Sequence, residues 1–222
     1  MSATAFTAVH RFRRRLKEAF YDAVPRGRLV RRGPSEIRRI ALSFDDGPNE
    51  LTEQYLDTLD RLGVPATFFV MGDLSEARPD LVREYVRRGH QIASHGYDHR
   101  RFPDLTWREV DEQLRKTDAA IGPQPTAHPW VRPPYGAMDA RVVAQLFARG
   151  YTIALWSLDS NDHDDHDPAS IGVRCAPEQV SPGEVLLFHE GQPWTLEALP
   201  GIVDGLRGAG YECVTMSDLF AT

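Results

Sequence analysis

The stretch "ALSFDDGPNE", residues 41–50, places two adjacent carboxylates directly after an apolar run. The residues up to Phe44 suit a buried strand, and Asp45 and Asp46 stand where that strand would end. A turn explains the glycine and the proline that follow. It does not explain the carboxylate pair, because two negative charges beside a buried strand are costly unless a positive group neutralises them. The stretch therefore predicts a strand end that faces a positive centre.

Strands and helices alternate along the chain outward from this stretch. The pattern predicts strands at residues 39–44, 66–70, 91–94, 130–133, 151–158, 183–190 and 211–216, and helices at 51–62, 79–88, 106–121, 139–149, 168–175 and 196–208. Such alternation indicates parallel βαβ units. About seven strands in one domain favour the α/β class, as an irregular (β/α) barrel that is closed or nearly closed. Functional groups in such barrels lie at the carboxyl ends of the strands.

The length and charge of the chain limit its class. Its 222 residues fit one folded domain, and no apolar run approaches the ~18 residues of a transmembrane helix. The net charge of −6 argues against general nucleic-acid binding, so no nucleic-acid partner is expected. The two cysteines show no metal-knuckle spacing and fit a reduced compartment, although a disulfide between them stays open.

Residues 1–37 differ from the rest of the chain because arginines are concentrated there. We expect a basic helix over residues 5–24 and a linker over 26–35, followed by the folded domain at 38–222. The helix would pack on the domain, contact an anionic membrane surface peripherally, or be disordered. A secretory signal is not indicated, since a continuous apolar core is missing and the arginines follow the apolar residues. We therefore expect a cytoplasmic protein, with inner-leaflet association as the alternative.

Polar side chains recur where the predicted strands end. Beyond the two aspartates, these strand ends carry His95 and His99, Arg132 and Tyr135, Asp159, Asp162 and His163, and finally His189 and Glu190. Because the carboxyl ends of parallel strands meet at one end of a barrel, we expect these groups to converge on one mouth.

His95 and His99 are four residues apart, a spacing that places both imidazoles on one side of a helical turn. Asp46 or Asp45 would complete three protein ligands and leave a position open for water, which is the arrangement of catalytic zinc. The other aspartate would then be free to accept a proton as a general base. A hydrogen-bonded pair of loop histidines is the alternative explanation for this spacing.

Five motifs together resemble the polysaccharide deacetylase family, the NodB-homology fold of carbohydrate esterase family four. They are "SFDDGP" (43–48), "SHGYDH" (94–99), "RPPYG" (132–136), the acidic loop after "LWSLD" (155–159) and "LLFH" (186–189). Each motif alone is weak or moderate evidence, but their joint order and spacing are specific. The resemblance covers about residues 38–220 and implies that 38–222 is a catalytic domain of this type.

The resemblance implies a metal centre with a base beside it. Asp45 would be the catalytic base, and Arg132 would orient it through charge-assisted hydrogen bonds. A divalent metal, usually zinc, with Co²⁺, Ni²⁺ or Mn²⁺ as alternatives, would be bound by Asp46, His95 and His99.

The same resemblance implies an acid and a groove. His189 would protonate the departing amine, and Asp159 would hydrogen-bond this histidine and keep it charged. The backbone N–H of Tyr135 would stabilise the developing oxyanion. The candidate substrate-binding residues are Pro133, Pro134, Tyr135, Asp162 and Trp194, although packing is the favoured role for the tryptophan.

The implied activity is metal-dependent removal of the N-acetyl group from an amino sugar in an oligosaccharide, a glycan precursor or a sugar conjugate. The same site could serve an amidase, a deformylase or an O-acetyl esterase. An inactive carbohydrate-binding module is a different class, but binding alone needs neither base nor acid. Non-haem iron oxygenases also use two histidines and a carboxylate, yet their chemistry leaves the pair Asp45 and His189 unused. The sugar, its chain length, the native metal and the oligomeric state stay open.

Two positions depart from the family's pattern. His163 stands where the fourth motif usually has tryptophan, and Glu190 follows His189 where aspartate is more usual. Loss of an aromatic wall would change the acyl pocket or the stacking of a sugar. His163 and His166 could add to a metal site, but a solvated loop is the favoured interpretation of "SNDHDDHD" (160–167).

Overall fold

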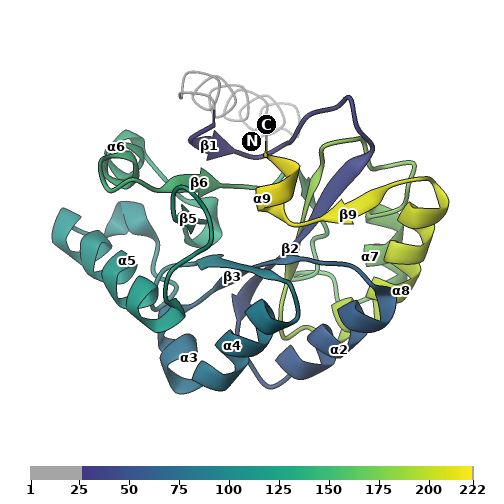
Figure 1. The fold of residues 1–222 in the computed structure, drawn as a ribbon, viewed down its shortest axis with the longest axis horizontal. Helices are drawn as coiled ribbons and strands as arrows, with labels where there is room; N and C mark the ends of the chain where they lie inside the picture. The colour runs from purple at the N-terminus through teal and green to yellow at the C-terminus, as the bar shows by residue number, and fades with distance from the viewer. Residues whose placement is uncertain (1–26, 222) are drawn as a thin grey trace, which may run out of the picture.

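A single curled sheet of parallel strands forms the centre of the molecule (Figure 1). The structure is a computed structural model that describes residues 27–221. Within these residues the sheet has nine strands, and β9 (Glu212–Val214) pairs with β2 beside the main path. The main path runs β1 (Leu29–Val30), β6 (Thr152–Ala154), β5 (Trp130–Val131), β4 (Gln91–Ser94), β3 (Thr67–Val70), β2 (Arg39–Gly47), β8 (Val185–His189), β7 (Leu158–Asp159). The α/β fold predicted from the alternating pattern, an irregular (β/α) barrel, is confirmed.

Helices surround the strands on the outside (Figure 1). They are α2 (Thr52–Leu62), α3 (Gly72–Ala77), α4 (Pro79–Arg87), α5 (Trp107–Ile121), α6 (Ala140–Ala148), α7 (Pro168–Arg174), α8 (Pro193–Gly208) and α9 (Met216–Leu219), with short 3₁₀ turns at Phe102–Asp104 and Pro134–Gly136. Helix α5 begins where its cap places it, because Thr106 and Glu109 form a reciprocal capping box at its start. Among residues 27–221, no helix combines the length and apolar composition needed to cross a bilayer.

The alternation of side chains along β2 explains why Asp45 points into the barrel. Every second residue of this strand packs in the core between the sheet and helices α2 and α8, namely Ile40, Leu42 and Phe44. Ala41 lies in a second cluster, which consists mainly of strand residues from across the sheet. Because successive side chains of a strand point to opposite faces, Asp45 lies on the same inner face as Ala41.

The structure differs from the predicted elements in three places. Leu29 and Val30, inside the predicted linker, form β1 and pair with β6. The run predicted as one strand at 151–158 is two strands, because its middle crosses from β1 to β8: Leu155 N–H donates to Val30 O, and Ser157 N–H donates to Val185 O (2.8 and 3.0 Å). Helix α3 has only six residues and was not predicted. The predicted basic helix at 5–24 lies outside the described residues.

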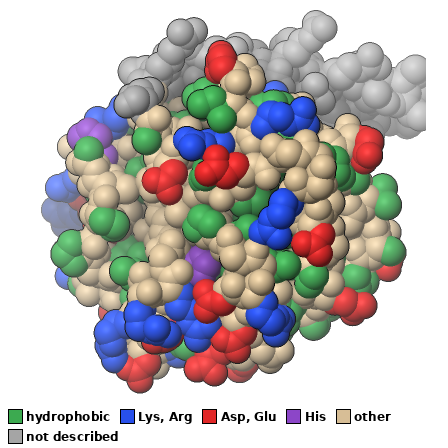
Figure 2. Space-filling model, turned by 45° about the vertical axis from the view of Figure 1, so that its right-hand side comes forward, with side chains coloured by type: hydrophobic (Ala, Val, Ile, Leu, Met, Phe, Trp, Pro, Cys, Tyr) green, Lys and Arg blue, Asp and Glu red, His purple; other side chains and the backbone are tan. Residues whose placement is uncertain are grey.

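Charged side chains of both signs are interspersed on the face of the molecule in Figure 2. Ion pairs connect neighbouring outer helices; Arg88 on the end of α4, for example, lies 2.6 Å from Asp57 and 2.9 Å from Asp60 of α2. Such exposed pairs contribute little stability each. Because positive and negative side chains are intermixed, the face shown in Figure 2 carries no extended region of one charge.

Candidate active site

Asp45 and His189 are placed side by side by the sheet. They are register partners in β2 and β8, so their side chains leave the sheet on the same face. The side chain of Arg132 is fully buried behind Asp45, and its Nη1 donates to Asp45 Oδ1 over 2.6 Å. Burial raises the pKa of Asp45, and the positive charges of Arg132 and His189 only partly offset that effect. The result is a buried, oriented carboxylate of increased basicity.

Arg132 is itself held by several strands at once. Its Nη2 donates to Ser43 Oγ over 3.0 Å, and its guanidinium lies 3.9 Å from the centre of the Phe69 ring. A guanidinium that is fully buried needs such partners, because an unpaired buried charge is strongly destabilising. The orientation predicted for Arg132, toward Asp45, is what the structure shows.

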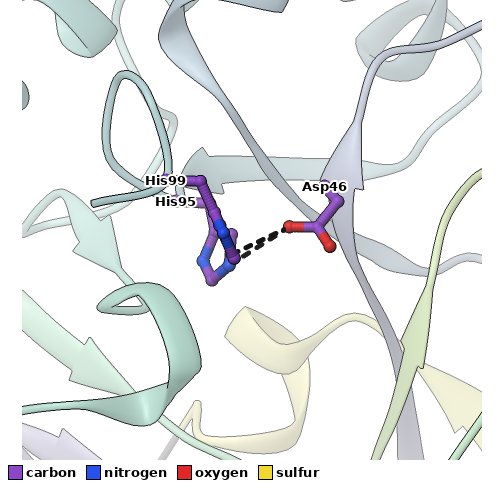
Figure 3. A group of neighbouring side chains, drawn as sticks. All are labelled: Asp46, His95 and His99. Atoms are coloured by element: carbon purple, nitrogen blue, oxygen red, sulfur yellow. Dashed lines mark ion pairs between the residues drawn. The ribbon is translucent and has the colours of Figure 1, made fainter. Parts of the chain in front are cut away.

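Asp46, His95 and His99 form a compact group (Figure 3). The group lies next to Asp45, whose Oδ2 is 3.6 Å from His95 Nε2. Both imidazoles point toward the Asp46 carboxylate, with His99 Nε2 and His95 Nε2 at 3.2 and 3.5 Å from Asp46 Oδ1. The spacing of four residues brings the histidines together through a loop after β4 rather than through a helical turn. The predicted convergence of these three residues is therefore present, although its local structure differs from the expected one.

The atoms of this group fit a divalent cation. Asp46 Oδ1 is buried and has no hydrogen-bond partner among the described residues. His95 Nδ1 donates to Arg132 O over 2.8 Å, so the Nε2 atom presents its lone pair to Asp46. Burial lowers the pKa of His95 to about 3, which keeps this imidazole neutral at ordinary pH. One carboxylate oxygen and two imidazole nitrogens that face one another match the ligand set of a metal ion.

The backbone is strained around this group. Asp46, His99 and Tyr135 all adopt left-handed φ angles of 73°, 60° and 61°. Each such non-glycine residue costs on the order of 1–3 kcal/mol and persists only where surrounding contacts enforce it. Strain gathered at one end of the barrel supports a functional role for that end.

His189 is held as a charged imidazole by Asp162. His189 Nδ1 lies 2.7 Å from Asp162 Oδ1, and its backbone N–H donates to Asp162 Oδ2 over 2.8 Å. Burial disfavours the imidazolium, but the hydrogen bond to Asp162 and the charge of Asp45 outweigh it and raise the pKa of His189 to about 9. His189 is therefore protonated at neutral pH.

The prediction that Asp159 is the partner of His189 is wrong. Asp159 is exposed at the end of β7, and its Oδ1 accepts a hydrogen bond from the backbone N–H of Asn161. The chain turns back at Asn161, which has a left-handed φ of 60°, and this turn carries Asp162 inward. Asp162 was predicted only as a groove residue. Thr195 Oγ1, which donates to Asp162 Oδ2 over 2.6 Å, was not predicted at all, because it lies far along the chain in α8.

The motif "RPPYG" (132–136) lies beside the group formed by Asp46, His95 and His99. Pro133 and Pro134 are buried, whereas the Tyr135 side chain is 63% exposed and its ring lies 4.5 Å from the His99 ring. Among residues 27–221, the Tyr135 N–H has no backbone carbonyl as acceptor. Its availability agrees with the predicted role in binding an oxyanion, which stays a prediction.

Trp194 supports the acid side of the site. Its Nε1 donates to the backbone carbonyl of Asp162 over 2.7 Å, and its ring stacks on His166 at 4.0 Å between centroids. It is partly buried against the core. Trp194 thus helps to hold the loop that carries Asp162, and its contact with a sugar stays a prediction.

Glu190 has a structural place that the sequence did not reveal. Its backbone N–H donates to Asp45 O over 2.8 Å, and its buried carboxyl group is bonded to the hydroxyls of Thr52 and Tyr85. A Cβ on Gly47 would collide with the Glu190 carboxyl group and the Tyr85 hydroxyl, so a larger residue there would displace these side chains. Burial raises the pKa of Glu190 to about 7. Glu190 therefore connects the end of β2 to helices α2 and α4.

The fold and this end of the sheet define a (β/α)-barrel protein in which a group that fits a divalent cation lies beside a buried carboxylate and a protonated histidine. The chain belongs to the polysaccharide deacetylase family, whose model matches residues 32–154.

The chain is similar to several characterised members of this family. A peptidoglycan-N-acetylglucosamine deacetylase of Listeria monocytogenes is 36% identical over 185 residues, which is 82% of this chain and 39% of that protein. The chain thus spans about two fifths of that longer relative. A chitooligosaccharide deacetylase of Sinorhizobium fredii is 35% identical and matches 83% of this chain and 93% of its own length. The structure of a family 4 carbohydrate esterase from Streptomyces lividans in complex with acetate superimposes with a TM-score of 0.74 at 31% identity, covering 79% and 91% of the two chains.

Proposed function

We propose that this protein is a metal-dependent hydrolase that removes the N-acetyl group from an N-acetylated amino sugar and releases acetate and a free amine. The observation that carries the proposal is the arrangement at the mouth of the barrel. A group that fits a cation lies beside a buried, oriented carboxylate and a histidine that is protonated at neutral pH. Metal-dependent amide hydrolysis uses a cation, a base and an acid of this kind together.

Asp46, His95 and His99 would hold the cation, and we propose zinc because two imidazoles and one carboxylate are a common set of zinc ligands. Co²⁺, Ni²⁺ and Mn²⁺ are the alternatives. A divalent cation bound there supplies Lewis acidity, which polarises an acyl carbonyl and makes water more acidic.

Asp45 would take the proton of the attacking water. Its Oδ1 is occupied by Arg132, whereas Oδ2 lies 3.6 Å from His95 Nε2 and so faces the metal-fitting group. The pKa of Asp45, raised by burial, makes this oxygen a better proton acceptor than an exposed aspartate. The ion pair with Arg132 keeps the carboxylate ionised and fixed in orientation.

His189 would give a proton to the leaving nitrogen. An amine leaves poorly unless it is protonated, so breaking the C–N bond needs an acid next to the departing atom. The imidazolium held by Asp162 supplies that proton, and the pair of register partners puts the acid next to the base. The N–H of Tyr135 would donate to the carbonyl oxygen as negative charge develops on it.

The names of the relatives support an amino-sugar substrate. They act on N-acetylglucosamine of peptidoglycan and on chitooligosaccharides. We therefore place the substrate of this protein among glycans that contain N-acetylglucosamine. An O-acetyl ester or an N-formyl sugar remains a competing substrate for the same groups.

The test is a product assay on protein loaded with one equivalent of Zn²⁺. We expect acetate release from chitooligosaccharides or peptidoglycan fragments, and slower release from acetyl-xylan and N-formylglucosamine. Asp45→Asn is the matched control: it should keep the metal but lose about 10²–10⁴-fold in turnover. Metal-loaded protein that releases no acyl group from any amino sugar would overturn the proposal, and so would full activity in the Asp45→Asn variant.

A further inference from the structure

A second group of metal-ligating side chains surrounds the proposed acid. Asp162, His163 and His189 each offer a ligand atom within 4.8 Å of the others. The His163 side chain is 44% exposed, and its ring lies 5.1 Å from the ring of His189. His163 stands where the family resemblance leads one to expect tryptophan, which cannot bind a metal. This donor set is therefore a property of this chain.

We propose that Asp162, His163 and His189 form a second, weaker cation site whose occupation inhibits the enzyme. Two imidazoles and a carboxylate are the same kind of ligands as those of the first group. The inhibition rests on the proposed function, in which His189 is the acid. The binding of a second cation does not rest on it.

The surroundings of the group favour a cation. Five aspartates lie within nine residues of this loop, at positions 159, 162, 164, 165 and 167. Asp164 Oδ2 lies 3.4 Å from His163 Nε2, so negative charge extends to the exposed side of the group. Clustered charge of one sign raises the local concentration of counter-ions.

The existing hydrogen bonds explain why this site would be the weaker one. Asp162 already bonds to His189 and Thr195, and a cation must replace part of these interactions. The distance of 2.7 Å from His189 Nδ1 to Asp162 Oδ1 is that of a shared proton, and metal bonds of about 2.0–2.2 Å require the two atoms to move slightly apart. His163 is half-exposed on a loop and can follow such a movement.

Occupation of the site removes the acid whichever ring nitrogen of His189 binds the cation. The cation takes a lone pair that a proton otherwise uses, and that proton passes to solvent. The ring is then neutral with at most one N–H, and a further proton loss would leave an imidazolate. The bound His189 therefore has no proton to give at ordinary pH.

Calorimetric titration of metal-free protein with Zn²⁺ tests the binding. We expect two equivalents in the unaltered chain, with the second at least about 10-fold weaker, and only one in His163→Phe. The matched control is His166→Phe, because His166 lies in the same loop but stacks on Trp194 outside the group; this variant should keep both equivalents. His95→Ala should lose the tight equivalent and keep the weak one. A single equivalent in the unaltered chain, or two in His163→Phe, would overturn the proposal.

Activity measured over a range of Zn²⁺ tests the inhibition. With each protein normalised to its own rate at one equivalent, the unaltered chain should lose activity as the second site fills. His163→Phe should need at least about 10-fold more Zn²⁺ for the same loss. Equal inhibition of both proteins would overturn the inhibitory role. If no deacetylation is found at any Zn²⁺ concentration, the proposed function fails, while the titration still decides whether the second site exists.

Discussion

Two histidines at the same end of the barrel have opposite ionisation. Both lie at the end of a strand, His95 buried and His189 partly buried, yet the pKa of His95 is lowered to about 3 and that of His189 is raised to about 9. The main difference is the partner of Nδ1. His95 gives its Nδ1 proton to the neutral carbonyl of Arg132, whereas His189 bonds through Nδ1 to the carboxylate of Asp162.

The comparison teaches how one residue type serves two purposes. When Nδ1 bonds to a neutral carbonyl, burial lowers the pKa of the imidazole. The ring then stays neutral with a free Nε2 lone pair, as a metal ligand must be. When Nδ1 bonds to a carboxylate, the ion pair raises the pKa more than burial lowers it, and the imidazole keeps its second proton, as an acid must. The hydrogen-bond partner of Nδ1 therefore sets the charge of each imidazole, and substitutions at these residues test this explanation.

The largest effect is expected from His95→Ala. Loss of a residue behind a metal ligand costs about 10–100-fold in affinity, so loss of the ligand itself should cost more than about 100-fold. After dialysis that removes weakly bound zinc, zinc content by elemental analysis should fall from one equivalent toward zero, and activity should fall to background. His128→Ala is a control at an exposed position and should keep the metal. Unchanged zinc content in His95→Ala would remove this histidine from the ligand set.

His189→Ala should remove the proton donor and leave the metal in place. Zinc content should stay at one equivalent, and turnover of an amide should fall by about 10²–10⁴-fold because the proton donor is lost. An activated aryl ester has a leaving group that needs no proton, so its hydrolysis should fall much less. Equal losses on both substrates would argue against His189 as the acid.

Asp162→Asn should convert His189 toward the state of His95. In the unaltered chain the acid is protonated below its pKa, which its partner Asp162 raises, so kcat/KM should fall as pH rises through the pKa of His189. Removing the Asp162 charge should move this fall to lower pH by about 1–2 units. Asp159→Asn, at the exposed residue first expected to pair with His189, should leave the profile in place. An unchanged profile in Asp162→Asn would contradict the assignment.

The smallest effect on catalysis is expected from Glu190→Gln, which instead changes stability. The pKa of Glu190 is raised from 4.5 to about 7 in the folded chain, so the folded state holds its proton more tightly than the unfolded state. This contribution is complete below about pH 4.5 and is lost as pH rises through about 7, a change of about 3 kcal/mol in the free energy of unfolding. Denaturant unfolding should show that the variant lacks this decline. The same decline in both proteins would mean that Glu190 ionises normally.

Much of the site could be predicted because it depends on local patterns. The alternation along β2 places Asp45 inside, and the motifs that contain Asp46, His95 and His99 end β2 and β4, which are separated only by β3. Strand ends converge in any parallel barrel, so these residues meet wherever the fold forms. Arg132 follows the same rule.

The rest depends on contacts between distant residues. Asp159 and Asp162 are equally plausible partners of His189 in the sequence, and only the turn at Asn161 together with Thr195 in α8 selects Asp162. Strand β1 has two residues, too few for any pattern. The role of Glu190 depends on Tyr85, which is 105 residues away in the chain. The cytoplasmic location and the membrane contact of residues 5–24 stay predictions.

The contrast between the two histidines can be measured directly by ¹⁵N NMR of histidine-labelled, metal-free protein. The account predicts that the ring nitrogens of His189, assigned with the His189→Gln variant, titrate with a midpoint near pH 9, while those of His95 show no titration between about pH 5 and pH 10. A His189 ring that is neutral at pH 7, or a His95 ring that takes up a proton near pH 6.5, would contradict it.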